Sequence, residues 1–469
     1  MPELPEVETV KNVLIPIVKG RKILDIEIKR RTTIQGDPVV FIDSLKGETF
    51  NDISRIGKFL IFHLTNEKVL ISHLRMEGKY YEFDEDEPDS KYARVVFHFD
   101  NNKKLCYDDS RCFGIMILSS EKEYRQEKEI SKLGPEPFAI NDVSFLLKAS
   151  KGKKLPIKSN LLDQSLMTGL GNIYVDEVLY ASKIHPLTPS YAVTKKEWEL
   201  IVKNAKTILT TAIELGGSTI KSYHPGKDID GNFQTRIKIY GKSGEECPEC
   251  HSTYRFIKVG GRGTTFCPKC QQKHGIPLNV AITGKIASGK STILEAFKNK
   301  GFDVLSCDEV VKNLYLNKDV SEHIEKLLGI SFNDAKVDKD ILRKHLIENP
   351  KDKKKLEKYV HGLVREEVEK FLLTSNSKIR VVEVPLLFES KFDMMFDTII
   401  VTDIKEEKQL SLLKNRDGFK SDDLRVINSN NQIDQNKNKA TYLISNNSSK
   451  EEFNKKCEDV ISKLISHLD

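Results

Sequence analysis

The run GKIASGKS at residues 284–291 constrains the fold more than any other part of the sequence. It fits the pattern G-x4-G-K-S, in which backbone N–H groups surround a phosphate, the lysine reaches the β- and γ-oxygens and the serine holds magnesium. The apolar segment LNVAIT precedes this run and the helical pattern STILEAF follows it. The later segments FDVLSCDEV, KIRVVEVPLLF and DTIIVTDI each lead into helical sequence. This alternation predicts an α/β domain built on a parallel sheet.

The chain has 469 residues and therefore calls for two or three domains. The pattern changes near residues 271–278, where we place the main boundary. A formal charge of +6 permits a nucleic-acid partner without requiring one. Because the sequence shows no signal-peptide pattern and no apolar run long enough for a bilayer, we expect a cytoplasmic protein without membrane contact.

The sequence before the boundary falls into a strand-rich part and a helical part. Between residues 20 and 118, short β-branched or alternating runs predict strands, namely KILDIEIKR, FLIFHL, KVLISHL, ARVVFHF and GIMILSS. From about residue 120, apolar spacings of three and four predict helices in DVSFLLKAS, LLDQSLM, NIYVDEVLYASKI and KKEWELIVKNAKTILTTAIEL.

Four of the eight cysteines form two C-x2-C pairs, Cys247 with Cys250 and Cys267 with Cys270. Sixteen residues separate the pairs, a spacing typical of zinc ribbons. Four thiolates fill a tetrahedral coordination sphere, so one structural zinc ion is expected, with a redox role as the alternative. The hairpin between the pairs presents Arg262 between glycines, where it either contacts phosphate or faces solvent.

The segments after the glycine loop carry groups suited to phosphoryl transfer. Asp308, in VLSCDEVV, can accept a proton from a hydroxyl nucleophile. Glu383 and Pro385 follow the next strand, at the edge where ligands bind in such sheets. Arg416, in LLKNRDG, is placed to stabilise phosphate. Each of these residues is also compatible with a surface or capping position.

The order of these motifs resembles dephospho-CoA kinases over residues 279–469, through AITGKIASGKST, CDEVV, LEKYVHGLVREEV, VVEVPLLFES, QLSLLKNRDG and ATYLISNN. The resemblance implies ATP-dependent phosphorylation of the ribose 3′-hydroxyl of dephospho-CoA, with Mg²⁺, Asp308 as base and Lys290 and Arg416 as phosphate clamps. The implied ATP-binding residues are Gly284, Lys285, Ile286, Ala287, Ser288, Gly289, Lys290, Ser291, Thr292 and Arg416. The sequence departs from the family pattern at Lys285, Ala287, Gly362, Leu412 and Thr441.

The chain opens with MPELPEVETV. Removal of the initiator methionine would leave Pro2 with a free secondary amine, whose pKa of about 8 keeps part of it nucleophilic at neutral pH. Such an amine can form an iminium with C1′ of an opened deoxyribose, and Glu3 and Glu6 could move protons beside it. The alternative is an ordinary helix start, where proline and glutamate are both favoured.

The whole first part resembles formamidopyrimidine-DNA glycosylases, through PELPEVETV, IGKFL, SHLRMEG, DSRCFG, LGPEP, GNIYVDEVLY and GGRGTTFCPKCQ in family order. The resemblance implies excision of oxidised purines such as 8-oxoguanine from damaged double-stranded DNA, followed by β,δ-elimination. It implies that Pro2 attacks C1′, Glu3 donates a proton, Lys58 aids β-elimination, and Arg262 grips the lesion phosphate and aids δ-elimination.

The same resemblance implies the DNA contacts and the domain plan. The DNA-binding residues are His73, Met76, Tyr92, Arg111, Phe113, Lys154, Lys158 and Asn172, with Met76, Arg111 and Phe113 filling the gap left by the extruded base. Cys112 and Tyr92 replace residues usual in the family, and a loop over residues 217–233 would cover the extruded purine.

We therefore expect a multidomain chain of four parts and a monomer. The parts are a β-sandwich over 1–120, a helix-two-turn-helix domain over 121–235, a zinc finger over 236–272 and a P-loop kinase over 279–469. The rival hypothesis is a non-catalytic DNA-binding module fused to a nucleotide switch or to a nucleoside or nucleotide kinase.

Overall fold

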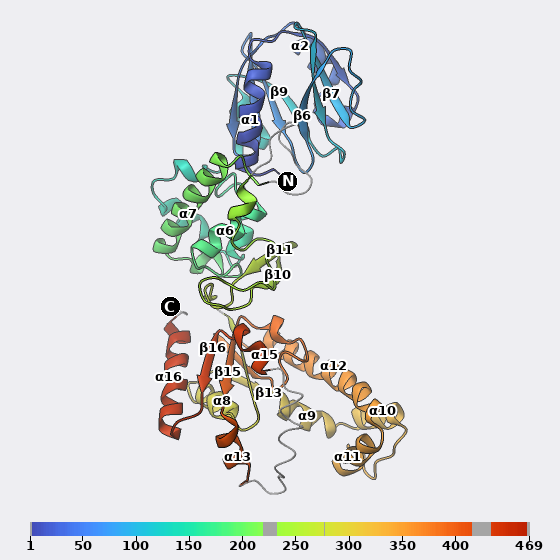
Figure 1. Cartoon of the computed structure of the whole chain (residues 1–469), viewed down its shortest axis with the longest axis vertical. Coiled ribbons are helices and arrows are strands. Elements are labelled where there is room, and N and C mark those ends of the chain that lie inside the picture. Colours follow the sequence, from blue (N-terminus) through green and yellow to red (C-terminus); the bar gives the residue numbers. More distant parts are fainter. Residues whose placement is uncertain (1, 219–231, 276, 415–432, 467–469) are drawn as a thin grey trace. The chain divides into compact units, whose positions relative to one another are not determined.

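The computed structural model describes residues 2–218, 232–275, 277–414 and 433–466. The chain forms two compact units, each treated separately below (Figure 1). The first unit contains Met1–Ser182, Val193–Lys242 and Lys258–Thr265, and the second contains Lys183–Ala192, Ser243–Ile257 and Phe266–Asp469. The four cysteines therefore belong to the same compact unit as the phosphate loop.

The first unit begins with a β-sandwich. One sheet has the strand order β1-β7-β8-β6 and the other β2-β9-β5-β4-β3. Pairing is antiparallel throughout, except that β2 runs parallel to β9. The strands are β1 (Ile23–Ile28), β2 (Ile34–Gln35), β3 (Phe50–Ile56), β4 (Phe59–Leu64), β5 (Lys68–His73), β6 (Lys79–Asp84), β7 (Ala93–Phe99), β8 (Lys103–Asp108) and β9 (Ile115–Ser120).

The sandwich closes around side chains that alternate inward along its strands. Phe62 from one sheet and Phe97 from the other both contact the ring of Phe50. Helix α1 (Leu4–Val18) adds Val7 and Leu14 to the same buried cluster. Because α1 begins only three residues into the chain, this packing fixes the position of the N-terminal residues relative to the sandwich. A short helix, α2 (Pro38–Leu45), is capped by the Asp37 side chain.

Helices form the rest of the first unit. They are α3 (Lys128–Ser131), α4 (Ser144–Ser150), α5 (Ile157–Leu162), α6 (Asn172–Ala181) and α7 (Lys195–Glu214). Helix α7 opens with a capping box between Thr194 and Glu197 and buries Trp198. The helix predicted over LLDQSLM is wrong beyond Leu162: Asp163 is extended, and Gln164 turns its side chain back onto the chain at Leu162, Gly169 and Leu170. This turn brings Gly171 to the start of α6.

A two-stranded hairpin, β10 (Arg255–Val259) and β11 (Arg262–Phe266), follows. Its turn, Gly260–Gly261, has positive φ at both residues and therefore suits glycine. The cysteine pairs flank the hairpin in sequence.

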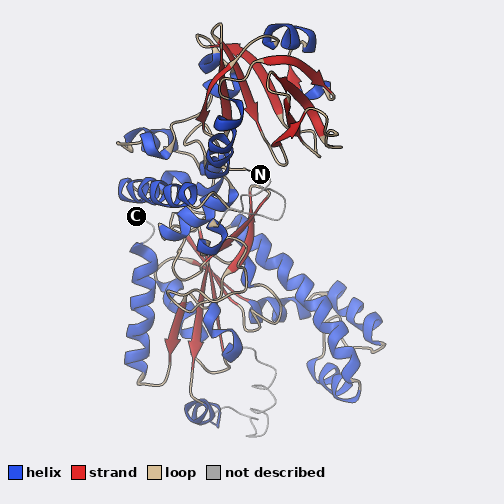
Figure 2. Cartoon of the chain, turned by 45° about the horizontal axis from the view of Figure 1, so that its top comes forward, coloured by secondary structure: helices blue, strands red, loops and turns tan. Residues whose placement is uncertain are grey.

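The second unit contains a five-stranded parallel sheet of order β13-β14-β12-β15-β16 (Figure 2). The strands are β12 (Leu278–Gly284), β13 (Asp303–Ser306), β14 (Ile379–Glu383), β15 (Thr398–Asp403) and β16 (Tyr442–Ser445). The predicted parallel α/β sheet is thus present, and β12, which leads into the phosphate loop, lies at its centre.

Helices cover both faces of this sheet. Val280 and Ile282 of β12 pack with Phe297 of α8 and Phe453 of α16 on one face, whereas Ala281 faces a second cluster that includes Val364 of α12. The helices are α8 (Lys290–Asn299), α9 (Cys307–Tyr315), α10 (Lys318–Leu328), α11 (Lys339–Glu348), α12 (Pro350–Thr374), α13 (Glu406–Lys414), α15 (Ile433–Asn436) and α16 (Lys450–Ser466).

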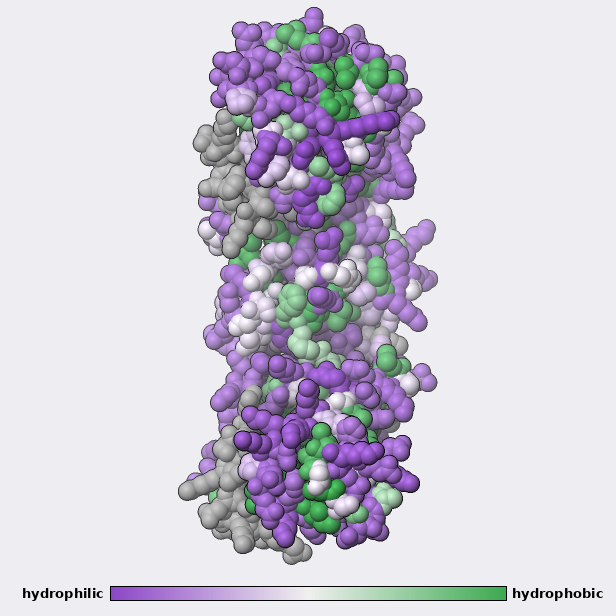
Figure 3. All heavy atoms as spheres, turned by 90° about the vertical axis from the view of Figure 1, so that its right-hand side faces the viewer, coloured by the Kyte–Doolittle hydropathy of each residue, from purple (hydrophilic) through white to green (hydrophobic). Residues whose placement is uncertain are grey.

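Among the described residues, no helix combines the length and the apolar character that a membrane crossing requires. The face drawn in Figure 3 is mostly hydrophilic, with scattered hydrophobic patches.

Candidate active sites and zinc centre

The first unit contains a cavity of about 320 Å³ where the sandwich meets the helices. Its lining combines six residues predicted from the sequence with six that were not. The predicted ones are Glu3, Lys58, His73, Met76, Asn172 and Arg262; the others are Arg75, Leu162, Gln164, Gly171, Ile173 and Tyr240. Pro2 is buried directly before Glu3.

Glu3 is anchored at the start of α6. Its carboxylate accepts hydrogen bonds from the backbone N–H groups of Gly171 at 2.6 Å and Ile173 at 3.0 Å. A Cβ on Gly171 would lie 2.3 Å from the Glu3 carboxyl carbon, so only glycine allows this approach. The glycine directly before α6 thus admits a carboxylate of the same chain.

Burial dominates the electrostatics of this carboxyl group. It raises the pKa of Glu3 to about 7, although Lys58 and the backbone donors pull the pKa down. Glu3 can therefore hold a proton near neutral pH. Burial also lowers the pKa of the Lys58 ammonium, which donates to the Leu170 carbonyl at 2.7 Å, so this amine loses its proton more easily than an exposed lysine.

The carboxylate of Glu6, which was suggested as a second proton carrier, is engaged in structural hydrogen bonds. Its carboxylate accepts hydrogen bonds from Glu3 N at 2.9 Å, Tyr174 Oη at 2.7 Å and Ser218 N at 2.8 Å. These bonds tie the first turn of α1 to α6 and to the segment after α7.

Hydrogen bonds from α5 and α6 hold the hairpin tip in place. Lys158 pairs with Asp176 at 2.7 Å and donates to the Gly263 carbonyl at 3.0 Å, and Asn172 donates to the same carbonyl at 3.1 Å. Lys158 has no exposed surface, so the direct phosphate contact expected of it does not fit this structure; its ammonium instead holds the residue beside Arg262. Arg262 itself is exposed and reaches the cavity.

Met76, Arg111 and Phe113 lie on two loops of the sandwich that approach the same side chain. A Cβ on Gly78 or on Gly114 would lie 2.3 Å or 1.6 Å from the Tyr107 hydroxyl oxygen. Because both positions are glycine, both loops can pack over this tyrosine. The Asp109 carboxylate orders the second loop by accepting from the N–H groups of Arg111, Phe113 and Gly114 at 2.7–2.9 Å.

The exposed tip of this second loop carries Phe113 and Arg111, two of the residues predicted to fill the gap left by an extruded base. Phe113 is 52% exposed, and the Arg111 guanidinium lies 4.9 Å from its ring centre. An exposed aromatic ring beside a cation suits contact with bases.

The other predicted DNA contacts differ in exposure. Lys154 and Tyr92 are exposed, whereas His73 is buried, with its pKa lowered to about 3 by burial and by Arg75. His73 is therefore neutral, and its Nδ1 accepts from the Arg75 N–H at 2.9 Å. The covering loop expected over 217–233 lies for the most part outside the described residues, as does Arg416.

Sequence reasoning missed Gln164, Tyr240 and Arg75 in the cavity wall. Gln164 bonds the Gly169 N–H and the Leu170 carbonyl, and it thereby shapes the glycine segment before α6. Tyr240 is set by its N–H, which donates to Glu177 at 2.9 Å. The one local signal for Gln164 was a polar side chain five residues before Gly169.

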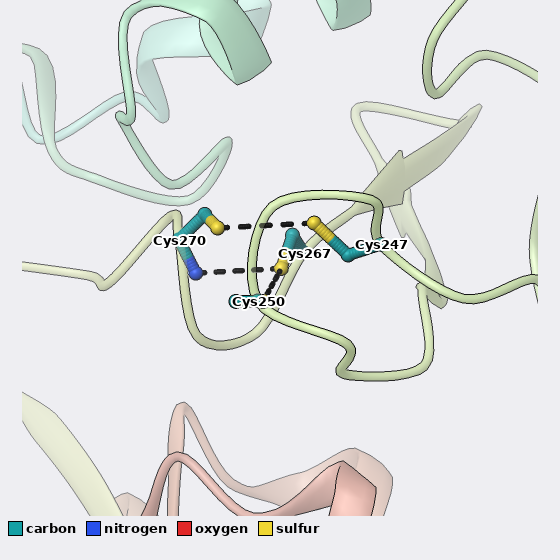
Figure 4. Close-up of side chains that lie close together, drawn as sticks. All are labelled: Cys247, Cys250, Cys267 and Cys270. Atoms are coloured by element: carbon teal, nitrogen blue, oxygen red, sulfur yellow. Dashed lines mark hydrogen bonds between the residues drawn. The ribbon is translucent and has the colours of Figure 1, made fainter.

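The four cysteines converge, as Figure 4 shows. Their sulfur atoms all lie within 4.8 Å of one another, with Cys250–Cys267 at 3.3 Å and Cys247–Cys270 at 3.8 Å. Sulfurs held tetrahedrally at about 2.3 Å from zinc would lie about 3.8 Å apart. The donor set and spacing therefore fit a structural zinc ion with no position left for water.

The phosphate loop follows β12 in the second unit. Ala287 and Gly289 have positive φ, and the Lys290 ammonium lies over the loop, donating to the carbonyls of Gly284 and Lys285 at 3.1 and 3.0 Å. Two side chains from other elements hydrogen-bond the loop: Asn446 donates to the Ser288 carbonyl, and Gln409 donates to the Ile286 carbonyl. Lys285, a departure from the family pattern, pairs with Asp434 at 2.6 Å.

Acidic groups gather at the carboxyl end of the sheet beside this loop. Glu383 ends β14, accepts a hydrogen bond from Ser306 at 3.2 Å and interacts electrostatically with Lys290 and Asp308. Burial raises its pKa. Asp308 is exposed in the first turn of α9, two residues after β13 ends at Ser306. Ser291 and Thr292 are exposed at the start of α8.

The fold and these sites define a zinc-finger DNA glycosylase joined to a P-loop kinase. Family models match in the same order: formamidopyrimidine-DNA glycosylase N-terminal domain over residues 1–116, its H2TH domain over 133–224, the zinc finger found in FPG and IleRS over 244–273, and dephospho-CoA kinase over 278–452.

Relatives match the first part over their full length. The formamidopyrimidine-DNA glycosylase of Streptococcus pneumoniae strain R6 is 44% identical over 274 residues, which is 58% of this chain and 100% of the relative. That of Lactobacillus gasseri is 42% identical over 272 residues, covering 58% and 99%.

Solved structures agree. A Lactococcus lactis FPG mutant in complex with Fapy-dG-containing DNA matches with a TM-score of 0.55 and 40% identity over 58% of this chain and 100% of its own. MutM in complex with carbocyclic 8-oxo-G-containing DNA matches with a TM-score of 0.55 and 39% identity over the same shares.

The chain belongs to the formamidopyrimidine-DNA glycosylase family and carries a dephospho-CoA kinase domain after its zinc finger. It is a bifunctional fusion of the two enzymes.

Proposed function

We propose that the first part excises oxidised purines such as 8-oxoguanine and formamidopyrimidines from duplex DNA and then cuts the abasic strand by β,δ-elimination. The observation that carries this proposal is the Glu3 carboxyl group, buried beside Pro2 and able to hold a proton near neutral pH. Family relatives bound to Fapy-dG-containing and abasic DNA support the substrate class.

In this mechanism the freed Pro2 nitrogen attacks C1′ of the damaged nucleotide and forms a covalent iminium as the base leaves. Glu3 supplies the proton that the opening sugar and departing base require. Lys58, whose pKa is lowered by burial, then assists β-elimination from the same cavity. Arg262 binds the lesion phosphate and assists δ-elimination.

The remaining predicted DNA-binding residues are assigned roles that suit their position and exposure. Met76, Arg111 and Phe113 fill the space left by the extruded nucleotide, and Lys154, Tyr92 and Asn172 contact the strand. His73 contributes as a neutral wall of the cavity. Lys158 acts indirectly, by holding the hairpin tip.

We propose that the second part transfers the γ-phosphoryl group of ATP to the ribose 3′-hydroxyl of dephospho-CoA. Residues 284–292 would bind the phosphates, with Lys290 neutralising charge and Ser291 holding Mg²⁺, which supplies further charge neutralisation when bound. Asp308 accepts the hydroxyl proton. Glu383 and Lys290 interact at the same edge of the sheet, which supports this placement.

We further propose the division into parts at 1–120, 121–235, 236–272 and 279–469, and a monomer. Four metal-binding thiolates require a reducing compartment, which favours the cytoplasm.

Borohydride trapping tests the first activity. Protein whose intact mass shows loss of Met1 should form a stable covalent adduct with abasic duplex DNA, mapped to Pro2. Protein that retains Met1 should form none. A DNA-binding module without catalysis would bind the duplex in both forms and yield no adduct in either.

A substrate comparison tests the second activity. With Mg²⁺ and ATP, the full chain should phosphorylate dephospho-CoA at least about tenfold faster than nucleosides or nucleotides. Equal rates would favour a nucleoside or nucleotide kinase, and ATP hydrolysis without transfer would favour a nucleotide switch.

A further inference from the structure

Arg255 is a buried cation of the zinc hairpin that no step above uses. It begins β10, is 5% exposed, and interacts with the carboxylates of Asp393 and Asp397. Its guanidinium donates to the backbone carbonyls of Asp393 and Phe396, the latter at 3.4 Å. These acceptors lie in the segment that leads into β15 of the kinase sheet, about 140 residues further along the chain.

Four more contacts lie at the same edge of the sheet. Lys273 pairs with Asp397 at 2.8 Å, and the same Asp397 oxygen accepts the Asn279 N–H at 2.9 Å. Tyr442 donates to Gln272 at 2.8 Å. Asn438 donates to Thr253 at 2.6 Å.

These contacts converge on the amino-terminal ends of three neighbouring strands. Asn279 is the second residue of β12, Asp397 precedes β15, and Tyr442 begins β16. The phosphate loop follows the opposite end of β12. The zinc hairpin therefore contacts the end of the sheet opposite the phosphate loop. Contacts at this end can stabilise the kinase fold without touching the groups that transfer phosphate.

Lys273 and Gln272 lie close to the kinase in sequence, so their contacts alone could follow from the short connection. Arg255 and Thr253 lie between the two cysteine pairs, and their partners are remote in sequence. A buried guanidinium is costly to desolvate unless its donors are met, and here kinase backbone carbonyls meet two of them. The position of these two residues depends on the fold of the cysteine hairpin.

We propose that the zinc finger is an integral part of the kinase fold, docked through Arg255 on the amino-terminal edge of its sheet, so that one zinc ion stabilises both enzymes. Zinc folds the finger, and the folded finger presents Arg255 to the segment before β15. The proposal does not depend on the kinase substrate or on glycosylase chemistry.

The single tryptophan allows a test on the full chain. Trp198 lies in the first unit, so its fluorescence reports unfolding of that unit, whereas circular dichroism also records the second unit. Zinc is removed with a chelator, loss is verified by titrating the freed thiols, and zinc is then restored. We expect removal to lower the dichroism transition of the second unit by at least about 5 °C, reversibly.

Arg255→Met should lower the same transition in zinc-loaded protein, and zinc removal should then lower it little further. Lys258→Met is the matched control, because Lys258 is an exposed cation on the same strand; it should behave like the unchanged chain. If Arg255→Met and Lys258→Met melt alike, the proposal fails.

Arg255→Met could lower the transition by disturbing the zinc finger itself. Two variants on the kinase side separate this effect from the loss of the contact. Tyr442→Phe and Asp397→Asn leave the hairpin sequence intact and should retain one zinc per chain, yet each should lower the second transition and reduce its response to zinc. A second transition that stays fixed when the thiols are shown to be free would overturn the proposal.

Discussion

Glu3 sits under two opposing influences. Backbone N–H groups at the start of α6 favour its anion, while burial and the neighbouring Glu6 favour the neutral acid. Burial is the largest of these effects, so the pKa rises to about 7. The result is a carboxyl group whose position is fixed by hydrogen bonds and whose proton is available near neutral pH.

Glu3→Gln should abolish base excision and spare Schiff-base chemistry. Glutamine keeps the shape but has no proton to donate, so excision of 8-oxoguanine should fall by at least about 100-fold in single-turnover assays. An abasic site has already lost its base, so borohydride trapping through Pro2 should persist. Glu27→Gln, an exposed change on β1, is the control. Full excision by Glu3→Gln would contradict the assigned role.

The pKa of Glu3 also predicts opposite pH trends for two steps. Excision needs Glu3 protonated and Pro2 neutral, with pKa values of about 7 for Glu3 and about 8 for an ordinary terminal amine. Between pH 7.5 and 9, the fraction in this state falls about sixfold, whereas the fraction with neutral Pro2 rises about fourfold.

Single-turnover rates on the two substrates measure this difference directly. Base excision should therefore slow over this interval while cleavage of a preformed abasic site speeds up. Parallel pH profiles for both substrates would show that Glu3 is not the proton donor.

At this scale the sequence points to the groups proposed to react but not to the groups that hold them. Pro2, Glu3 and Arg262 could be predicted because their motifs are local. For Lys158 the sequence predicted a DNA contact but gave no sign of the buried bond to Asp176, which forms only through the packing of α5 on α6. Cavity-wall residues such as Tyr240 have no local pattern at all.

The packing of α5 and α6 against the hairpin strand β11 depends on one buried ion pair, Lys158 with Asp176. Asp176 of α6 accepts from Lys158 at 2.7 Å and from the Thr265 N–H of β11 at 3.2 Å, so a single carboxylate joins two helices and a strand. Burial raises the pKa of Asp176 to about 6, even though Lys158 lowers it. The carboxylate is therefore mostly ionised at neutral pH and needs its partner.

Lys158→Met should destabilise this unit strongly, because it leaves a buried carboxylate without its cation. Removal of one member of such a pair costs about 3–5 kcal/mol. The double change Lys158→Met with Asp176→Asn should cost less than the single one. Urea unfolding followed by Trp198 fluorescence measures both, and Lys203→Met, an exposed lysine on α7, should stay within about 0.5 kcal/mol. Equal stability of Lys158→Met and Lys203→Met would show that the pair is unimportant.

Strands with apolar or regularly alternating runs could be predicted, and β6 and β8 could not. FLIFHL and ARVVFHF gave clear patterns, whereas β6 and β8 carry lysines, tyrosines and acids. Lys104 of β8 is buried because Asp89 pairs with it at 2.8 Å, a contact that sequence spacing does not reveal. In the second unit every predicted strand is present, and the pattern is clearest in β12 and β15, which are buried and mostly apolar.

At the scale of the molecule, the two chemistries share no group. The reacting side chains of the glycosylase belong to the first compact unit and the phosphate loop belongs to the second. Motif order predicted this organisation. The assignment of the cysteines to the kinase-containing unit was not foreseen, because it depends on contacts between residues about 140 positions apart.

Separate active sites predict separable activities in the full chain. Glu3→Gln should lose excision and keep its rate of dephospho-CoA phosphorylation within about twofold, since its hydrogen-bond donors Gly171 and Ile173 and the neighbouring Lys58 all belong to the first unit. Lys290→Met should reduce the rate of phosphorylation by at least about 100-fold, because the cation that neutralises the transferring phosphoryl group is gone, and should keep full excision.

Both variants are assayed for both reactions at the same zinc content. Damaged duplex is added to the kinase assay, and ATP is added to the excision assay. Neither addition should change a rate, because the two reactions have no common intermediate. A kinase rate that responds to damaged DNA, or that falls in Glu3→Gln, would mean that the two enzymes are coupled in a way their chemistry does not require.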